Sequence, residues 1–188
     1  MKNMGLFGTF AVLVLIVGVM FFTKPGDQQP SSLLNQLKFM DLTSSAFAHN
    51  AAIPSVYTCE GTNINPPLAM SNIPAEAKSL AMIVHDPDAP RAGGFTHWVI
   101  WNIDPKTSTI AENSVPAGAV QGANGAGENS WMGPCPPSGN HHYEFTLYAL
   151  DTMLNLPAAT DKAGLEKAVE GHVLAKTQLI GLYQKKQQ

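Results

Sequence analysis

Three short apolar runs, each bounded by turn residues, constrain the fold of this chain more than any other feature. They cover residues 79–84, 98–103 and 143–150, and the last is rich in aromatic and β-preferring residues. Runs of this length between Gly, Pro, Asp and Asn are typical of strands buried in a sheet. A shorter strand is expected near residues 56–58. The sequence therefore predicts a mainly β domain joined by Pro- and Gly-rich connections.

The composition favours one domain and argues against a nucleic-acid-binding surface. The chain has 188 residues, of which 45% are hydrophobic and 13% charged, whereas ordinary soluble domains have roughly 25% charged residues. The net charge is −3, and the 11 Lys and Arg residues form no basic cluster. Binding to nucleic acid needs such a cluster to meet the phosphate backbone. No nucleic-acid partner is expected.

The N-terminal segment, residues 1–23, reads as a membrane anchor. Residues 5–22 contain no charged side chain, and as a helix they would extend roughly 27 Å, close to the hydrocarbon core of about 30 Å. A cleaved signal peptide is the alternative, although the small-residue cleavage pattern is missing where the run ends. The first reading places the domain outside the cytoplasmic membrane and anchored to it. The second places it free in the periplasm.

Residues 24–38 are expected to form a flexible linker, because they combine Pro and Gly with Ser and Gln. The folded domain is then expected to cover residues 39–188. Near its end, apolar residues recur from Asp161 at near-helical spacing, and Asp161 itself suits an N-cap. The apolar positions are Leu165, Val169, Val173, Leu179 and Ile180. This pattern predicts a C-terminal helix packed on the sheet.

Polar side chains gather where the predicted strands begin or end. Asp86 and Asp88 follow the first strand, His97 opens the second and His141 precedes the third. A stiff apolar wall with a few convergent polar groups is typical of a binding pocket. A carboxylate beside a histidine favours the imidazolium form, which can donate to an anion. The alternative is that the aspartates organise a turn and the histidines are solvated.

Metal and catalytic chemistry are weaker readings of the same residues. Two Asp and several His can ligate zinc or iron, but the sequence has no H-x-H, H-E-x-x-H or Cys cluster. A thiol nucleophile at Cys135 near His141 is possible in principle, yet Pro136 leaves no following amide N–H for an oxyanion hole. Ser130 and Ser138 lie in no G-x-S-x-G elbow. We therefore expect no metal, no cofactor and no enzymatic activity.

The chain has two cysteines, Cys59 and Cys135. An even number in an exported domain permits one disulfide, which would also stiffen the loop that carries the candidate site. The alternative is that both are small buried residues that never meet. The sequence leaves these two readings open.

These motifs together resemble the phosphatidylethanolamine-binding protein family, in its bacterial, Raf-kinase-inhibitor-like branch. The matching segments are residues 57–61, 65–68, 79–90, 97–103, 133–143, 148–151 and 171–175. The run DPDAP at residues 86–90 and the run GPCPPSGNHHY at residues 133–143 carry most of the resemblance. Position 96 is Thr, where animal members often have another histidine, and the loop at residues 134–137 also departs from the animal pattern.

The resemblance implies a β-sandwich of a large and a smaller antiparallel sheet with few short helices. It also implies a pocket for phosphate or a phosphoethanolamine-like headgroup, formed by Asp86, Asp88, His97, Gly133, Pro136, His141 and Tyr143. The expected function is non-catalytic binding of a small anion, with the membrane reached through the anchor. The alternative is a protein-interaction module similar to protease or kinase inhibitors.

Overall fold

Two β-sheets, one α-helix and a short 3-10 helix make up the described part of the chain. The computed structural model describes residues 39–186. Its elements are β1 (Asp41–Thr43), β2 (Ala51–Ala52), the 3-10 helix Ser55–Tyr57, β3 (Leu68–Ser71), β4 (Ser79–Asp86), β5 (Phe95–Ile103), β6 (Thr109–Ile110), β7 (Val120–Gln121), β8 (His141–Leu150), α2 (Lys162–Val169) and β9 (Val173–Tyr183). The three long apolar runs of the sequence lie in β4, β5 and β8.

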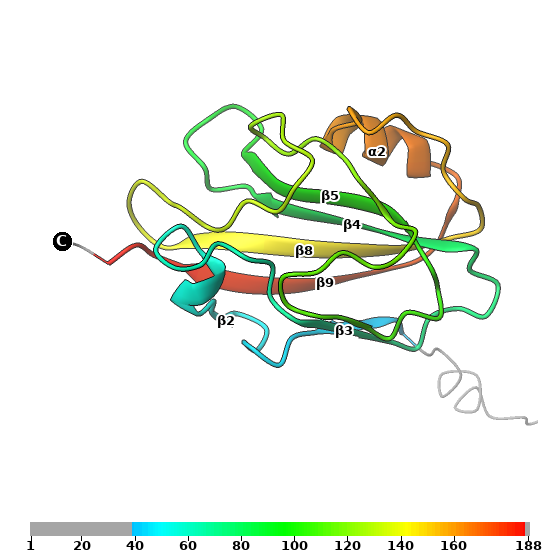
Figure 1. The fold of residues 1–188 in the computed structure, drawn as a ribbon, viewed down its shortest axis with the longest axis horizontal. Helices are drawn as coiled ribbons and strands as arrows, with labels where there is room; N and C mark the ends of the chain where they lie inside the picture. The colour runs from blue at the N-terminus through cyan, green and yellow to red at the C-terminus, as the bar shows by residue number, and fades with distance from the viewer. Residues whose placement is uncertain (1–38, 187–188) are drawn as a thin grey trace, which may run out of the picture. The chain divides into compact units, whose positions relative to one another are not determined.

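The sheets differ in size and face one another across the main core. The larger has the strand order β2-β9-β8-β4-β5-β7 and the smaller has the order β1-β3-β6 (Figure 1). Paired strands are antiparallel except β2 and β9, which are parallel. Two sheets of unequal size agree with the architecture that the resemblance implies.

β4 lies at the centre of the larger sheet and is buried on both faces. Leu80, Met82 and Val84 point toward the smaller sheet and pack in the core between the two sheets. Ala81 and Ile83 point the other way, into a second apolar cluster. Successive side chains of a strand alternate between faces, so a strand covered on both sides must be apolar throughout. This double coverage explains the continuous apolar run that ends at His85.

The second cluster lies under α2, which Figure 1 shows beside β5. Leu165 and Val169 of the helix are buried there with Trp101 of β5. The helix begins at its N-cap, Asp161, whose side chain accepts a hydrogen bond of 2.9 Å from the backbone N–H of Gly164. The predicted cap and the first two apolar positions of the predicted helix are therefore observed.

The prediction of a longer C-terminal helix is wrong. The helix ends at Val169, and Gly171 adopts a φ of +79°, a left-handed conformation that glycine adopts readily. The chain then enters β9, which pairs with β8 from Val173 to Tyr183. The last apolar residues of the chain follow a two-residue period instead of a helical one, since Leu179, Gly181 and Tyr183 are buried in alternation.

The predicted N-terminal membrane-spanning helix is not supported. The described residues include no helix that is both apolar and long enough to cross a membrane. The segment for which it was predicted, residues 5–22, and the predicted linker, residues 24–38, lie outside the described residues.

The core between the sheets gives a direct test of this fold. Leu147 on β8 is fully buried, whereas Leu174 on β9 is 41% exposed. We expect Leu147→Ala to lower the free energy of unfolding by about 2–5 kcal/mol, because the lost contacts leave a cavity in the core. The matched change Leu174→Ala is expected to have a much smaller effect. Guanidinium unfolding of both variants measures this, and equal losses would contradict the placement of β8 and β9.

Candidate functional site

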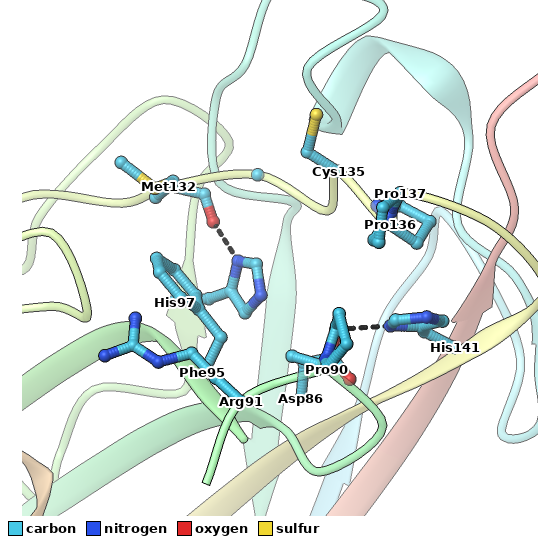
Figure 2. Close-up of a pocket in the computed structure, with 12 residues that line it drawn as sticks. Asp86, Pro90, Arg91, Phe95, His97, Met132, Cys135, Pro136, Pro137 and His141 are labelled. Carbon is cyan, nitrogen blue, oxygen red and sulfur yellow. Dashed lines mark hydrogen bonds and ion pairs between the residues drawn. The ribbon is translucent and has the colours of Figure 1, made fainter. Parts of the chain in front are cut away.

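A cavity of about 330 Å³ opens at one end of the central strands of the larger sheet, where β4 ends and β8 begins. Its walls come from these strand ends, from the start of β5 and from two loops, residues 87–94 and 131–140 (Figure 2). The lining residues are Asp86, Ala89, Pro90, Arg91, Phe95, His97, Met132, Gly133, Cys135, Pro136, Pro137 and His141. Five of the seven residues expected at the site therefore line one cavity.

Asp86 and His141 form a buried hydrogen-bonded pair in this cavity. Asp86 is the last residue of β4 and His141 the first of β8, so antiparallel pairing brings them to the same edge. His141 Nδ1 donates to Asp86 Oδ2 at 2.8 Å. The other carboxylate oxygen, Oδ1, accepts from the backbone N–H of Asp88 at 2.9 Å. Both oxygens of this buried carboxylate are thus hydrogen-bonded, which offsets the cost of removing it from water.

Asp88 lies outside the cavity lining and pairs with His142 on the surface. Its Oδ2 accepts from His142 Nδ1 at 2.7 Å and from the backbone N–H of the same residue at 2.8 Å. The Asp residues of the DPDAP run therefore tie the loop after β4 to the first two residues of β8. Asp88 contributes to the position of the loop rather than to the wall of the cavity.

His97 sits at the back of the cavity in a different environment from His141. Its Nδ1 donates to the carbonyl oxygen of Met132 at 2.6 Å. Its ring packs edge-on against the rings of Phe95 and Tyr143, with distances between ring centres of 4.9 and 5.1 Å. Burial lowers the pKa of His97 to about 4. Because the ring is buried, the neutral form of His97 is favoured over the imidazolium form that a neighbouring carboxylate led us to expect.

Tyr143 lies behind the cavity and is not part of its lining. The side chain is 1% exposed, and its hydroxyl has no hydrogen-bond partner among the described residues. Burial and the nearby negative charge of Asp86 raise the pKa of Tyr143, so the phenol stays protonated. The Tyr143 side chain thus places an uncharged phenol next to Asp86, behind the polar end of the cavity.

The loop that carries Gly133 and Pro136 forms the opposite wall. The N–H of Gly133 donates to Asn63 Oδ1 at 2.7 Å. A Cβ atom at Gly133 would lie 2.5 Å from the carbonyl oxygen of Tyr57, so a side chain cannot fit. Pro136 presents its ring to the cavity and, like its neighbour Pro137, has no N–H that needs a partner.

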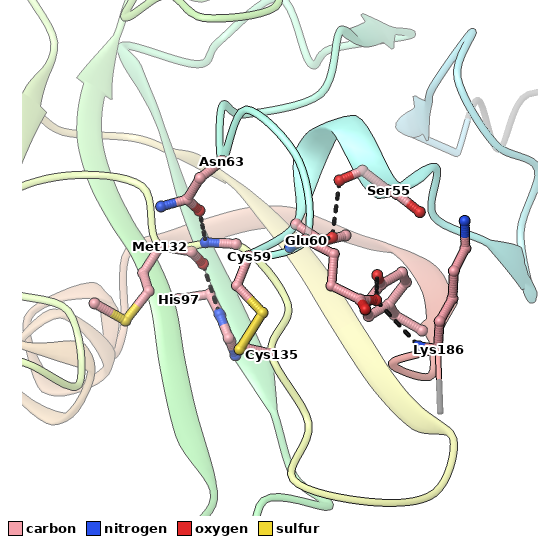
Figure 3. Close-up of a disulfide and its surroundings, with 11 residues drawn as sticks. Ser55, Cys59, Glu60, Asn63, His97, Met132, Cys135 and Lys186 are labelled. Atoms are coloured by element: carbon pink, nitrogen blue, oxygen red, sulfur yellow. Dashed lines mark hydrogen bonds between the residues drawn. A yellow bond between two sulfur atoms is a disulfide. The ribbon is translucent and has the colours of Figure 1, made fainter. Parts of the chain in front are cut away.

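A disulfide fixes this loop to the segment after the 3-10 helix. Cys59 and Cys135 are bonded (Figure 3), and the N–H of Cys59 donates to the carbonyl oxygen of Pro134 at 3.1 Å. Together with the bond from Gly133 to Asn63, these links hold the wall that carries Met132, the partner of His97. The sulfur of Cys135 is engaged in the disulfide, so the structure does not present it as a free nucleophile.

The sequence reasoning missed Arg91 and Phe95. The guanidinium of Arg91 lies 5.4 Å from the centre of the Phe95 ring, a cation–π arrangement at the edge of the cavity. Within residues 39–186 no carboxylate forms an ion pair with Arg91. The available signal was the position of Arg91 directly after the DPDAP run, where the rigid turn must direct the next side chain toward the cavity.

The carboxylates and histidines pair with one another instead of forming a cation site. In the described part of the chain no three His, Cys, Asp or Glu side chains gather in a way that could hold a metal ion. Each buried oxygen of Asp86 already faces an N–H donor. The arrangement thus presents one positive side chain, Arg91, and apolar walls at the cavity.

The described residues thus form a two-sheet β domain with a disulfide-braced cavity at the ends of β4 and β8. The sequence profile described as phosphatidylethanolamine-binding protein matches residues 43–184. An archaeal protein of Methanothermobacter thermautotrophicus, described as a UPF0098 protein, is 50% identical over 151 residues, which cover 78% of this chain and 99% of that protein. The chain belongs to the phosphatidylethanolamine-binding protein family.

Solved structures agree with this assignment. The crystal structure of a putative phosphatidylethanolamine-binding protein homologue from Chlamydia trachomatis is 43% identical, with a TM-score of 0.76 over 79% of this chain and 99% of that one. The structure of YbcL from E. coli, described as a member of the mammalian family, is 30% identical, with a TM-score of 0.74 over 78% of this chain and 99% of that one.

The low pKa of His97 predicts a stability change with pH. The unfolded histidine takes up a proton near pH 6.5 and the folded one only near pH 4, so protons below pH 6.5 favour the unfolded chain. We expect wild type to lose about 3 kcal/mol from this residue between pH 6.5 and pH 4. In His97→Asn the asparagine N–H can replace Nδ1–H as the donor to Met132, but the side chain does not titrate, so this pH-dependent loss of stability should be absent. Chemical unfolding at both pH values should show the difference, and parallel profiles would contradict it.

The disulfide predicts a second stability change. The two cysteines are 76 residues apart, and closing a loop of this size in the unfolded chain contributes roughly 4 kcal/mol. We expect the double change Cys59→Ser and Cys135→Ser to lower the free energy of unfolding by that amount. Dithiothreitol should produce a similar loss in wild type and none in the double variant. A wild-type protein insensitive to the reductant would contradict the assignment.

Proposed function

We propose that this protein binds a small phosphate-containing anion in the cavity between the DPDAP loop and the 131–140 loop, without chemical turnover. The observation that carries the proposal is the arrangement of polar groups at one end of an otherwise apolar cavity. Asp86 and His141 form a closed pair there, and Arg91 stands at the edge with no carboxylate partner in the described residues. The charge left available to a ligand is positive.

The size and walls of the cavity support a small ligand. Ligand cavities span about 300–1,000 Å³, and this one is near the lower limit at about 330 Å³. Phe95, Pro90 and Pro136 provide rigid apolar surfaces beside the polar end. An anionic group with a short organic substituent matches both parts, whereas a bare metal ion matches neither.

Membership of the family supports the same proposal. The E. coli structure carries the description of a member of the mammalian family, and a structure from Plasmodium vivax is described as a phosphatidylethanolamine-binding protein. The disulfide at the wall of the cavity suits an oxidising compartment, which is where we place the function of the domain.

A binding experiment on matched variants tests the proposal. Asp86→Asn leaves one acceptor oxygen where the carboxylate offers two, so either His141 Nδ1–H or the backbone N–H of Asp88 loses its acceptor, and the negative charge is removed. We expect phosphate and phosphoethanolamine, titrated calorimetrically, to bind this variant at least roughly tenfold more weakly, since hydrogen bonds to charged groups contribute about 1.5–3 kcal/mol.

The control is Asp151→Asn. Asp151 forms a similar pair with His172 at 2.8 Å, and neither residue lines the cavity. This variant is expected to bind as wild type does. If wild type binds neither probe, the proposal fails, and a protein partner sought by pull-down becomes the working hypothesis.

A further inference from the structure

One nitrogen of the cavity, His97 Nε2, is an acceptor without a donor. His97 Nδ1 bonds to the carbonyl oxygen of Met132, and a carbonyl can only accept, so Nδ1 carries the hydrogen. In the neutral ring Nε2 is then left with a lone pair. Nε2 is buried and has no hydrogen-bond partner among the described residues. Figure 2 shows this side of the ring turned toward the cavity.

The surroundings of His97 keep the ring neutral. Burial is the largest effect and lowers its pKa, while the hydrogen bond to Met132 and the negative charge of Asp86 only partly oppose it. The titratable and charged groups that face or flank the ring are Asp86 and His85 from β4, His141 and Tyr143 from β8, and Arg91 from the loop after β4. None of them donates a hydrogen bond to Nε2.

A ligand that presents only oxygen lone pairs to this nitrogen is therefore mismatched. The dianion of a phosphomonoester, a phosphodiester and sulfate are all ligands of this kind. Either a lone pair of the ligand meets the lone pair of Nε2, or His97 must take up a proton far above its pKa of about 4. A buried acceptor left unsatisfied in this way lowers affinity by roughly tenfold to a hundredfold.

We propose that the cavity selects a phosphomonoester in its singly protonated form, whose P–O–H group donates to His97 Nε2, over the phosphodiester of an intact phospholipid headgroup. The proposal rests on the anion-binding function proposed above and names the form of the anion. The proton comes from solvent when the free monoester is a dianion. The bound ligand carries one negative charge, which matches the single unpaired cation at the edge of the cavity, Arg91.

The sharpest test compares methyl phosphate with dimethyl phosphate at pH 5. The second pKa of a phosphomonoester is about 6, so both probes then carry one negative charge and differ by one O–H group. We expect methyl phosphate to bind roughly tenfold to a hundredfold more tightly. The apolar walls alone would favour the extra methyl group, so they cannot produce this preference.

Proton uptake gives an independent readout. Calorimetry at pH 7.5 in two buffers of different ionisation enthalpy should show that methyl phosphate binds with uptake of nearly one proton. At pH 5 the uptake should fall toward zero.

Phosphoethanolamine and glycerophosphoethanolamine distinguish a free monoester from a lipid headgroup, because they share the ethanolamine and differ in the second ester bond. The first is expected to bind more tightly by the same ratio.

The outcomes separate the two proposals. Equal affinity for both esters with no proton uptake would overturn the selection of a protonated monoester and leave anion binding in place. Absence of binding by every probe would overturn both. His97→Asn retains an N–H donor for Met132 and removes the Nε2 lone pair. In this variant the affinities for methyl phosphate and dimethyl phosphate should therefore differ by no more than roughly threefold. The wild-type measurements decide the question without this variant if it does not fold.

Discussion

The buried contact between Asp86 and His141 is the constraint around which the candidate site is organised. A carboxylate removed from water is tolerated only when its oxygens meet donors, and here one donor comes from the neighbouring strand and the other from the turn that follows. The same contact therefore fixes the edge of the sheet and the course of the DPDAP loop. That loop places Pro90 and Arg91 at the cavity. Local backbone geometry and ligand-facing chemistry thus depend on a single carboxylate.

Two histidines of one cavity differ in character because they have different partners. His141 donates to a carboxylate, whereas His97 donates to a backbone carbonyl. Burial lowers the pKa of His97 and so favours its neutral ring. The neutral ring of His97 therefore offers the lone pair of Nε2 to a ligand as an acceptor. The carbonyl oxygen that accepts from His97 Nδ1 belongs to a loop held by the disulfide and by Asn63.

The sequence was sufficient for features that depend on local pattern. Continuous apolar runs identify β4, β5 and β8, and the positions of Asp86, His97 and His141 at strand ends place them together. Prediction failed after Gly171, because Val173 fits a helical stripe as well as a strand, and only pairing with β8 decides between them. The hydrogen bond that orients His97 was also beyond local reasoning, since its partner Met132 is 35 residues away in the chain. Arg91 was missed because an exposed cation in a loop has no periodicity to mark it.

The disulfide also changes the connectivity of the domain. Joining Cys59 to Cys135 closes a covalent ring that contains β3 to β7 and most of the residues that line the cavity. A protease that cuts once within this ring, for example in the connection between β6 and β7, opens the ring but releases no fragment. The cavity would then consist of two polypeptides still joined through sulfur. In a compartment rich in proteases, the disulfide would keep the residues of the cavity together after such a cut.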